Sequence, residues 1–208
     1  SAKKETIGRT IIVAFLVCLV CSVIVSTAAV SLRPTQIQNQ LLDKQRNILS
    51  IAGLLEQGVS IEEQFAQVTP RLVDLRTGEF SDEHNPLTFD AQRAAGEAAL
   101  SSQLEAGDDI ANIRRRSHYA TVYMVEGDNG QVDTLILPIH GAGLWSTLYG
   151  FIALEGDMNT IIGLGFYQHA ETPGLGGEVD NPNWKRQWEG NRVYDADGQV
   201  ATAVVTGG

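Results

Sequence analysis

An uncharged run of 20 residues near the N-terminus limits what this chain can fold into more than any other feature. Residues 11–30 read IIVAFLVCLVCSVIVSTAAV and contain no acidic or basic side chain. At a rise of about 1.5 Å per residue, a helix of this length is about 30 Å long, which matches the hydrocarbon thickness of a bilayer. The run therefore predicts one transmembrane helix, within a membrane segment formed by residues 1–32.

The charges around this segment predict its orientation. Lys3, Lys4 and Arg9 precede the apolar run, whereas only Arg33 follows it closely. The positive-inside rule then puts the N-terminus in the cytoplasm and the main domain outside, in the periplasm of a Gram-negative cell. A cleavable signal peptide is the alternative, because the small residues at 26–28 resemble a cleavage site. The apolar run is long for such a peptide, which favours an anchor in the cell inner membrane.

Small side chains form one stripe of the predicted membrane helix, at Ala14, Cys18, Ser22 and Ser26. Such stripes let helices approach closely, so this face is predicted to dock on other membrane subunits. The alternative is that small residues are simply common in membrane helices. Cys21 makes a C-x-x-C with Cys18, but two ligands alone do not form a metal site, and lipid-embedded packing is the favoured interpretation.

The rest of the chain is strongly acidic. All 208 residues together carry a net charge of −10, and the first 33 contribute four basic residues and one acidic residue. The other 175 residues therefore carry −13, and a domain this acidic repels phosphate backbones. This excludes nucleic acid as the main partner, and the length predicts about one domain.

The chain after the membrane segment is predicted to be a helix followed by an α+β domain. Residues 33–57 place apolar side chains at mostly helical spacing, which predicts an amphipathic stalk or a first domain helix. Residues 58–208 are predicted to form the main domain. Its first half is expected to contain a strand at 71–75, a helix from 91 to about 104 capped by Asp90, and a short helical turn from 108 to 116.

Apolar runs separated by short polar turns predict an antiparallel sheet in the second half. The expected strands are residues 120–126, 132–139, 148–155 and 160–168. No crossover helix separates these strands, so neighbours are expected to run antiparallel. A short helix at 182–188 and a strand at 200–205 complete the order. The predicted fold class is therefore α+β, with one N-terminal transmembrane helix followed by an antiparallel-sheet domain with flanking helices.

Two glycine-rich loops interrupt these strands, at residues 140–146 (HGAGLWS) and 171–178 (ETPGLGGE). Each combines backbone N–H groups with large apolar side chains, which a planar cofactor with polar edges requires. Tight turns at the end of a sheet are the alternative. Gly176 is expected where a close backbone approach, or a positive φ, excludes a side chain. The candidate cofactor-binding residues are Leu144, Trp145, Glu171, Thr172, Gly174, Leu175 and Gly176.

No catalytic residue or metal site is predicted. The four histidines, at 84, 118, 140 and 169, are too widely spaced to form a ligand pattern. His169 lies close to Glu171 in the sequence, so contact with a cofactor and ordinary polar packing both stay open. The basic run at 114–116 is read as a solvated face or a contact with another subunit, with phosphate binding as the alternative.

Longer motifs point to a known family. They are VSTAAVSLR, LLDKQ, PRLVDL, IRRR, LPIHGAGLWSTLYGF, ETPGLGGEV and N-P-x-W. Together they resemble the C subunit of the sodium-translocating NADH:quinone reductase, an FMN-binding family, over nearly the whole chain. The G subunit of Rnf-type complexes shares the E-T-P-G-L-G loop, whereas LLDKQ, PRLVDL and HGxGLW favour the quinone reductase.

The resemblance implies a covalently bound FMN, attached through its phosphate to a threonine in the motif Ser/Thr-Gly-Ala-Thr. This sequence does not contain that motif. Neither Thr202, in A-T-A, nor Thr206, in T-G-G, has the matching context, so the attachment role is transferred to neither. The C-terminal part of the FMN-binding domain is accordingly expected to be missing from these 208 residues.

The resemblance also implies the function. The chain would be an electron-relay subunit of a hetero-oligomeric enzyme that reduces ubiquinone and transports sodium. Its FMN would receive electrons from a membrane iron–sulphur centre and deliver them to the flavin of the large membrane protein of the complex, its B subunit. No NADH site is expected in this chain. The alternatives are an Rnf-type G subunit and a flavin-free membrane-anchored assembly subunit.

Overall fold

The computed structural model describes residues 7–127 and 129–202. Contacts between Cα atoms divide the chain into two compact units, residues 1–43 and 44–208. The first helix, α1 (Ile7–Ile51), is 45 residues long and continues through Pro34. The helical segments expected on either side of Pro34 are therefore one helix. Proline removes one helix hydrogen bond, but the residues on both sides favour the helix strongly enough to continue it.

Helix α1 is the one helix in the described residues that is long and apolar enough to cross a membrane. Its side chains from 11 to 30 are all exposed in the structure. An apolar surface this long is unstable in water and needs a lipid or protein environment. The helix predicted from the sequence is thus present, with the small-residue stripe on its exposed surface.

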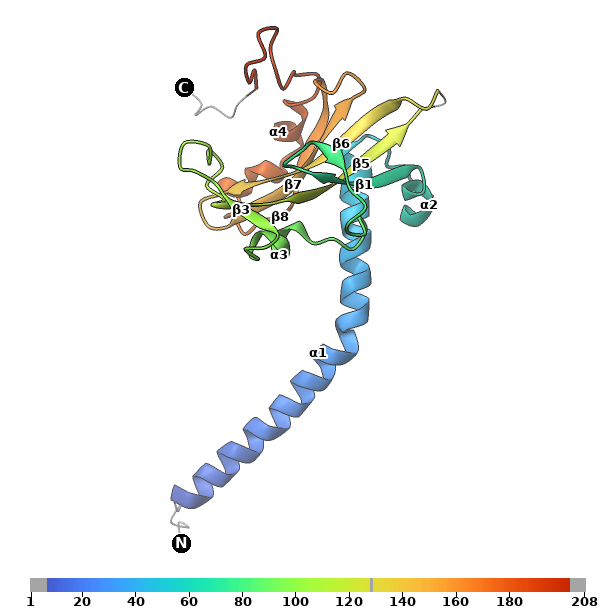
Figure 1. Cartoon of the computed structure of the whole chain (residues 1–208). Helices are drawn as coiled ribbons and strands as arrows, with labels where there is room; N and C mark the ends of the chain where they lie inside the picture. The colour runs from blue at the N-terminus through green and yellow to red at the C-terminus, as the bar shows by residue number, and fades with distance from the viewer. Residues whose placement is uncertain (1–6, 128, 203–208) are drawn as a thin grey trace. The chain divides into compact units, whose positions relative to one another are not determined.

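A six-stranded sheet forms the body of the second unit, in the order β2-β1-β5-β6-β7-β8 (Figure 1). Every neighbouring pair is antiparallel, as predicted. The strands are β1 (Val68–Asp74), β2 (Glu79–Phe80), β5 (Tyr119–Glu126), β6 (Val132–Ala142), β7 (Thr147–Glu155) and β8 (Ile161–Gln168). A separate pair consists of β3 (Ser101–Gln103) and β4 (Arg115–Ser117).

The core joins the last turns of α1 to one face of the sheet. Ile48 and Leu49 are fully buried there, in one cluster with Tyr123 of β5 and Phe151 of β7. Gly163 of β8 permits this contact, because a Cβ at that position would collide with the carbonyl oxygen of Ile51. Close packing of helix on sheet therefore depends on the absence of a side chain in β8.

The helix predicted from residue 91 begins as expected and ends early. Asp90 accepts hydrogen bonds from the amides of Gln92 and Arg93, both at 3.0 Å, at the start of α3 (Ala91–Ala95). The predicted extension to 104 is wrong, because the helix stops at Gly96 and residues 101–103 form β3. Pairing with β4 supplies the hydrogen bonds that a longer helix would have supplied.

Two further predictions differ from the structure. The helical turn at 108–116 is absent: Asp109 accepts the amides of Ile113 (2.8 Å) and Arg114 (2.7 Å) and directs the chain into β4. The strand at 200–205 is not formed at 200–202, where Val200 makes only a single bridge to Tyr194, and 203–205 lie outside the described residues.

The remaining helices are short. The helix predicted at 182–188 is confirmed as α4 (Pro182–Arg186), capped by Asn181. A 3-10 helix, η1 (Gly176–Asp180), and α2 (Ile61–Phe65), capped by Ser60, were not predicted. The predicted α+β class is confirmed.

Candidate functional site

The sheet register brings the two glycine-rich loops to the same end of the sheet. His140 of β6 is paired with Tyr149 of β7, and Tyr149 is paired with Gln168 of β8. The turn from β6 to β7 and the segment after β8 therefore begin next to each other. Strand β6 extends to Ala142, so the first loop is residues 143–146, shorter than predicted.

The side chain of Glu171 connects these loops. Its Oε1 accepts hydrogen bonds from the amides of Trp145 (3.1 Å) and Ser146 (3.2 Å), and the Ser146 hydroxyl lies 3.5 Å away. The Ser146 hydroxyl in turn accepts the amide of Ala170 at 2.8 Å. Glu171 is 8% exposed, and the bond from the Trp145 amide is the main cause that lowers the pKa of its carboxyl. The carboxylate is thus held ionised between the loops.

Three large apolar side chains on the same loops are turned to solvent. Leu144 is 81% exposed, Trp145 is 70% exposed and Leu175 is 71% exposed. Each such side chain left in water loses the free energy of about 1.5–3 kcal/mol that its burial would contribute. These two loops, joined by one carboxylate, therefore present three apolar side chains of a kind that suits the faces of a planar cofactor.

The second loop also offers backbone donors. Within the residues that the structure describes, the amides of Gly174 and Gly176 donate no hydrogen bond, whereas those of Leu175 and Gly177 donate to the Thr172 carbonyl (3.1 and 3.0 Å). Gly174 has φ 75°, a conformation that favours glycine. Two free N–H groups beside apolar side chains suit the polar rim of an isoalloxazine ring, so the residues present fit FMN.

Close backbone approach explains the glycine at 176. A Cβ there would lie 2.7 Å from Glu171 Oε2 and 3.1 Å from Glu171 Cβ. The close approach expected at this position is therefore present, while the positive φ belongs to Gly174. Gly143 on the opposite loop is constrained in the same way, since a Cβ there would collide with Glu171 Oε1 and with Leu148. This role of Gly143 was not predicted from the sequence.

His169 belongs to the framework of the second loop. Its Nδ1 accepts the amide of Glu171 at 3.2 Å, so its Nε2 carries the proton that is donated to Asp180 Oδ2 at 2.8 Å. Lys185 Nζ lies 3.5 Å from the other oxygen of Asp180. The polar-packing interpretation of His169 thus has direct structural support.

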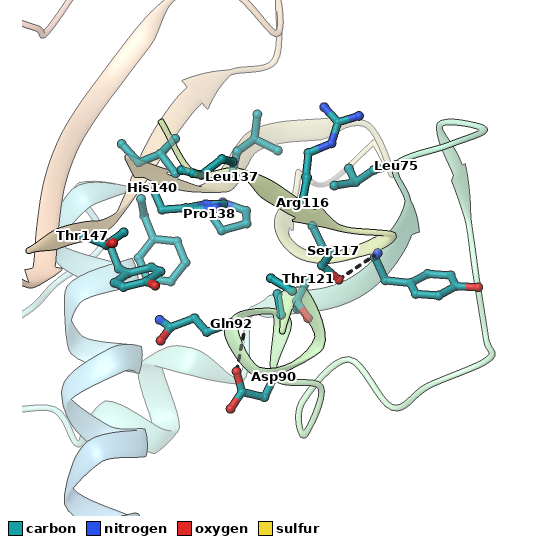
Figure 2. Close-up of a pocket in the computed structure, with 18 of the residues that line it drawn as sticks. Leu75, Asp90, Gln92, Arg116, Ser117, Thr121, Leu137, Pro138, His140 and Thr147 are labelled. Atoms are coloured by element: carbon teal, nitrogen blue, oxygen red, sulfur yellow. Dashed lines mark hydrogen bonds between the residues drawn. The ribbon is translucent and has the colours of Figure 1, made fainter. Parts of the chain in front are cut away.

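A cavity of about 790 Å³ lies over the sheet beside the first loop, and it was not predicted from the sequence (Figure 2). His140, Pro138 and Thr147 line one part of it, with Gln92 of α3 opposite. None of the seven predicted cofactor-binding residues lines it. Residues 119–123 of β5 and 137–140 of β6 line it together with residues of β7, and no sequence pattern marked this cavity in advance. The basic residues at 114–116 also line the cavity.

Comparison with known proteins gives the family. The FMN-binding domain family matches residues 143–207, which include both loops. The C subunit of the Na(+)-translocating NADH-quinone reductase of Pseudomonas aeruginosa is 57% identical over 99% of this chain and 80% of its own length. That of Yersinia pestis is 48% identical over 98% of this chain and 78% of its own length. This chain belongs to the family of these C subunits.

Solved structures of the family have the same fold. The crystal structure of Shewanella oneidensis NqrC, 38% identical, superposes with a TM-score of 0.74 over 82% of this chain and 79% of that chain. The C subunit from Parabacteroides distasonis, 29% identical, gives 0.64 over 84% and 77%. The chain is thus a subunit of an oxidoreductase complex, with one membrane anchor and an FMN-binding domain, as the motifs indicated. These relatives favour the quinone reductase over the Rnf-type alternative.

Proposed function

We propose that this chain relays electrons through an FMN held at the two joined loops. The flavin would take electrons from an iron–sulphur centre of neighbouring membrane subunits and pass them to the flavin of the B subunit. The observation that carries the proposal is the exposed group Leu144, Trp145 and Leu175, inside the region that matches the FMN-binding domain family. FMN supplies the electron-transfer chemistry, and the protein supplies position and electrostatics.

The residues of this chain would hold the flavin in distinct ways. Leu144, Trp145 and Leu175 would cover the ring faces and exclude water from them. The amides of Gly174 and Gly176 would bond the polar rim. The Thr172 carbonyl accepts the amides of Leu175 and Gly177 and so holds the turn that contains them. In this proposal another subunit oxidises NADH, and the present chain only passes the electrons on.

The covalent attachment point is a separate matter. The hydroxyl of Thr202 donates to the Arg192 carbonyl at 2.6 Å, so this oxygen is engaged in a structural bond. Thr206 lies outside the described residues. We therefore assign the phosphoester to neither threonine.

Mutation of the exposed side chains tests the proposal. Trp145→Ala and Leu175→Ala in the full-length chain should each shift the flavin redox titration and slow NADH-to-quinone turnover. Loss of the Trp145 ring removes a stacking partner worth roughly 1–3 kcal/mol, and loss of Leu175 uncovers apolar ring surface to water. Ile110→Ala is the matched control, since Ile110 is 96% exposed but lies outside both loops. Unchanged titrations in both loop variants would place the flavin elsewhere, and absence of flavin from the denatured wild-type chain would favour an assembly role.

The membrane helix is proposed to join the complex through Ala14, Cys18, Ser22 and Ser26. Ser22→Leu should overfill a close helix contact, at a cost of about 1–3 kcal/mol by analogy with overpacked cores. Val20→Leu changes a side chain outside the stripe and serves as the control. The yield of intact complex on native gels should fall for the first variant alone, and equal yields would contradict the proposed face.

A further inference from the structure

Glu171 occupies space that two glycines leave open. Gly143 lies on one side of its carboxylate and Gly176 on the other, and a Cβ at either position would collide with the Glu171 side chain. These glycines come from different loops, one before β7 and one after β8. The carboxylate is therefore packed between two backbones, and both backbones depend on where it lies.

The hydrogen bonds of Glu171 reach the residue that carries the largest exposed ring. Its Oε1 accepts the consecutive amides of Trp145 and Ser146, which fixes the backbone from which the indole projects. Leu175 is adjacent to Gly176, which lies against the other side of the same carboxylate. A shift of Glu171 would therefore alter the spacing between Trp145 and Leu175.

The backbone of Glu171 is itself held in place. Its amide donates to Nδ1 of His169, whose Nε2 donates to Asp180 in η1, and Asp180 pairs with Lys185 in α4. These contacts anchor the carboxylate to the short helices that follow the loop. Glu171 therefore connects the η1–α4 segment, which holds its backbone, to the loop at 143–146, whose amides it accepts.

We propose that Glu171 is a positioning residue, which sets the spacing between Trp145 and Leu175 by accepting the amides of Trp145 and Ser146. It acts through these loops and not by presenting its charge to the flavin. The inference rests on the proposed function for the flavin, while the hydrogen bonds themselves stand without it. A residue that tuned the flavin by charge would respond to neutralisation, whereas a positioning residue responds to loss of the acceptor oxygen.

Two substitutions separate these roles in the full-length chain within the assembled complex. Glu171→Gln removes the charge and keeps an acceptor oxygen at the same reach, whereas Glu171→Ala removes both. Amide hydrogen exchange at 145–146, followed by mass spectrometry, reports the hydrogen bonds directly. The flavin redox titration and visible spectrum report the ring environment. Glu189→Ala, which removes an exposed charge outside the loops, is the control.

Protection of the amides at 145–146 from exchange is expected to be highest in the wild type, lower in Glu171→Gln and lowest in Glu171→Ala. Exchange at 145–146 should rise about tenfold or more in Glu171→Ala, because bonds to a charged acceptor are the stronger ones, and Glu171→Gln should restore most of the protection. The flavin potential should follow the same order. Equal potential shifts in the Gln and Ala variants would overturn the proposal in favour of charge tuning, and unchanged exchange in the Ala variant would overturn it outright.

Failure of the proposed function gives a different result. The flavin redox titration could stay unchanged in Trp145→Ala and Leu175→Ala while amide exchange at 145–146 still rises in Glu171→Ala. The loops would then be joined as described but would not hold the flavin. That outcome removes the positioning role and the flavin site together. If Glu171→Ala does not fold, Glu171→Gln alone is the test. The positioning role predicts near-wild-type amide exchange and flavin potential for this variant, whereas charge tuning predicts a shifted potential.

Discussion

Gly143 and Gly176 are both required because the Glu171 side chain occupies the space that a Cβ would need. Neither has a positive φ, so backbone conformation alone would accept another residue at both positions. Glycine is required because a Cβ would overlap the Glu171 side chain at both positions and, at Gly143, the Leu148 side chain as well. The glycine-rich appearance of the two loops thus has two causes, a left-handed conformation at Gly174 and close contact at the other two positions.

Gly176→Ala should destabilise the domain by about 1–3 kcal/mol, because the added methyl group overlaps the Glu171 side chain. Gly107→Ala adds the same methyl group in open space and should change stability by less than about 0.5 kcal/mol. Urea unfolding of the two full-length variants in detergent measures the difference. Equal midpoints would mean that the loop relaxes around the new methyl group without cost.

A carboxylate outside the site predicts a pH dependence. Asp157 accepts the Thr160 hydroxyl (2.6 Å) and the amides of Asn159 and Thr160 (2.9 and 2.7 Å), and the hydroxyl bond is the main cause that lowers its pKa from 3.8 to about 2. A lowered folded-state pKa stabilises the fold above the unfolded value, and this contribution is lost as the pH falls through the folded value.

Asp157→Asn should therefore be less stable than wild type above about pH 4, and the difference should shrink towards about pH 2. The asparagine keeps one acceptor for the amides but loses the oxygen that bonds the Thr160 hydroxyl. Thermal midpoints measured at several pH values within this range test the expectation. A difference that stays constant with pH would show that the charge plays no part.

Among the elements, α1 and β8 pack with their backbones in close contact. The end of α1 contributes Ile48 and Leu49 to the core, and β8 admits it through Gly163 and Gly165. A Cβ at Gly163 would meet the backbone of Ile51, which cannot rotate away. A Cβ at Gly165 would lie 3.2 Å from Cδ1 of Ile51 and 3.7 Å from Nζ of Lys185, and both of these side chains can adjust.

Gly163→Ala should consequently cost more stability than Gly165→Ala. We expect about 1–3 kcal/mol or more for the first and under about 1 kcal/mol for the second. The two variants differ only by position in one strand, so each is the other's control. Chemical unfolding of both should show the lower midpoint for Gly163→Ala, and the reverse order would contradict the described contact between helix and strand.

For the whole molecule, the orientation of the membrane anchor determines on which side of the membrane the acidic domain lies. The basic residues before the apolar run predict a cytoplasmic N-terminus. A reporter that is active only outside the cytoplasmic membrane should therefore be active when fused after Gly208 and inactive when fused before Ser1. Activity of the N-terminal fusion alone would reverse the orientation and exclude a periplasmic relay.

The sequence alone determined the membrane helix, the four consecutive strands from β5 to β8 and the identity of both loops. Long apolar runs and alternating strands are local patterns, because each residue's preference depends on neighbours a few positions away. The cap at Asp90 was readable for the same reason. The family motifs also predicted the cofactor, FMN, because the loop residues occur in the order that is typical of this family.

Only the tertiary structure decided how the site is assembled. Residues 101–103 became a strand because β4 lies beside them, and this partner is distant from any local pattern. Glu171 was expected among the cofactor-binding residues, yet its carboxylate accepts the amides of Trp145 and Ser146, which lie on a loop about 25 residues earlier in the chain. Contacts between segments far apart in sequence leave no periodic signal, since their geometry is set by strand register and not by the spacing of side chains.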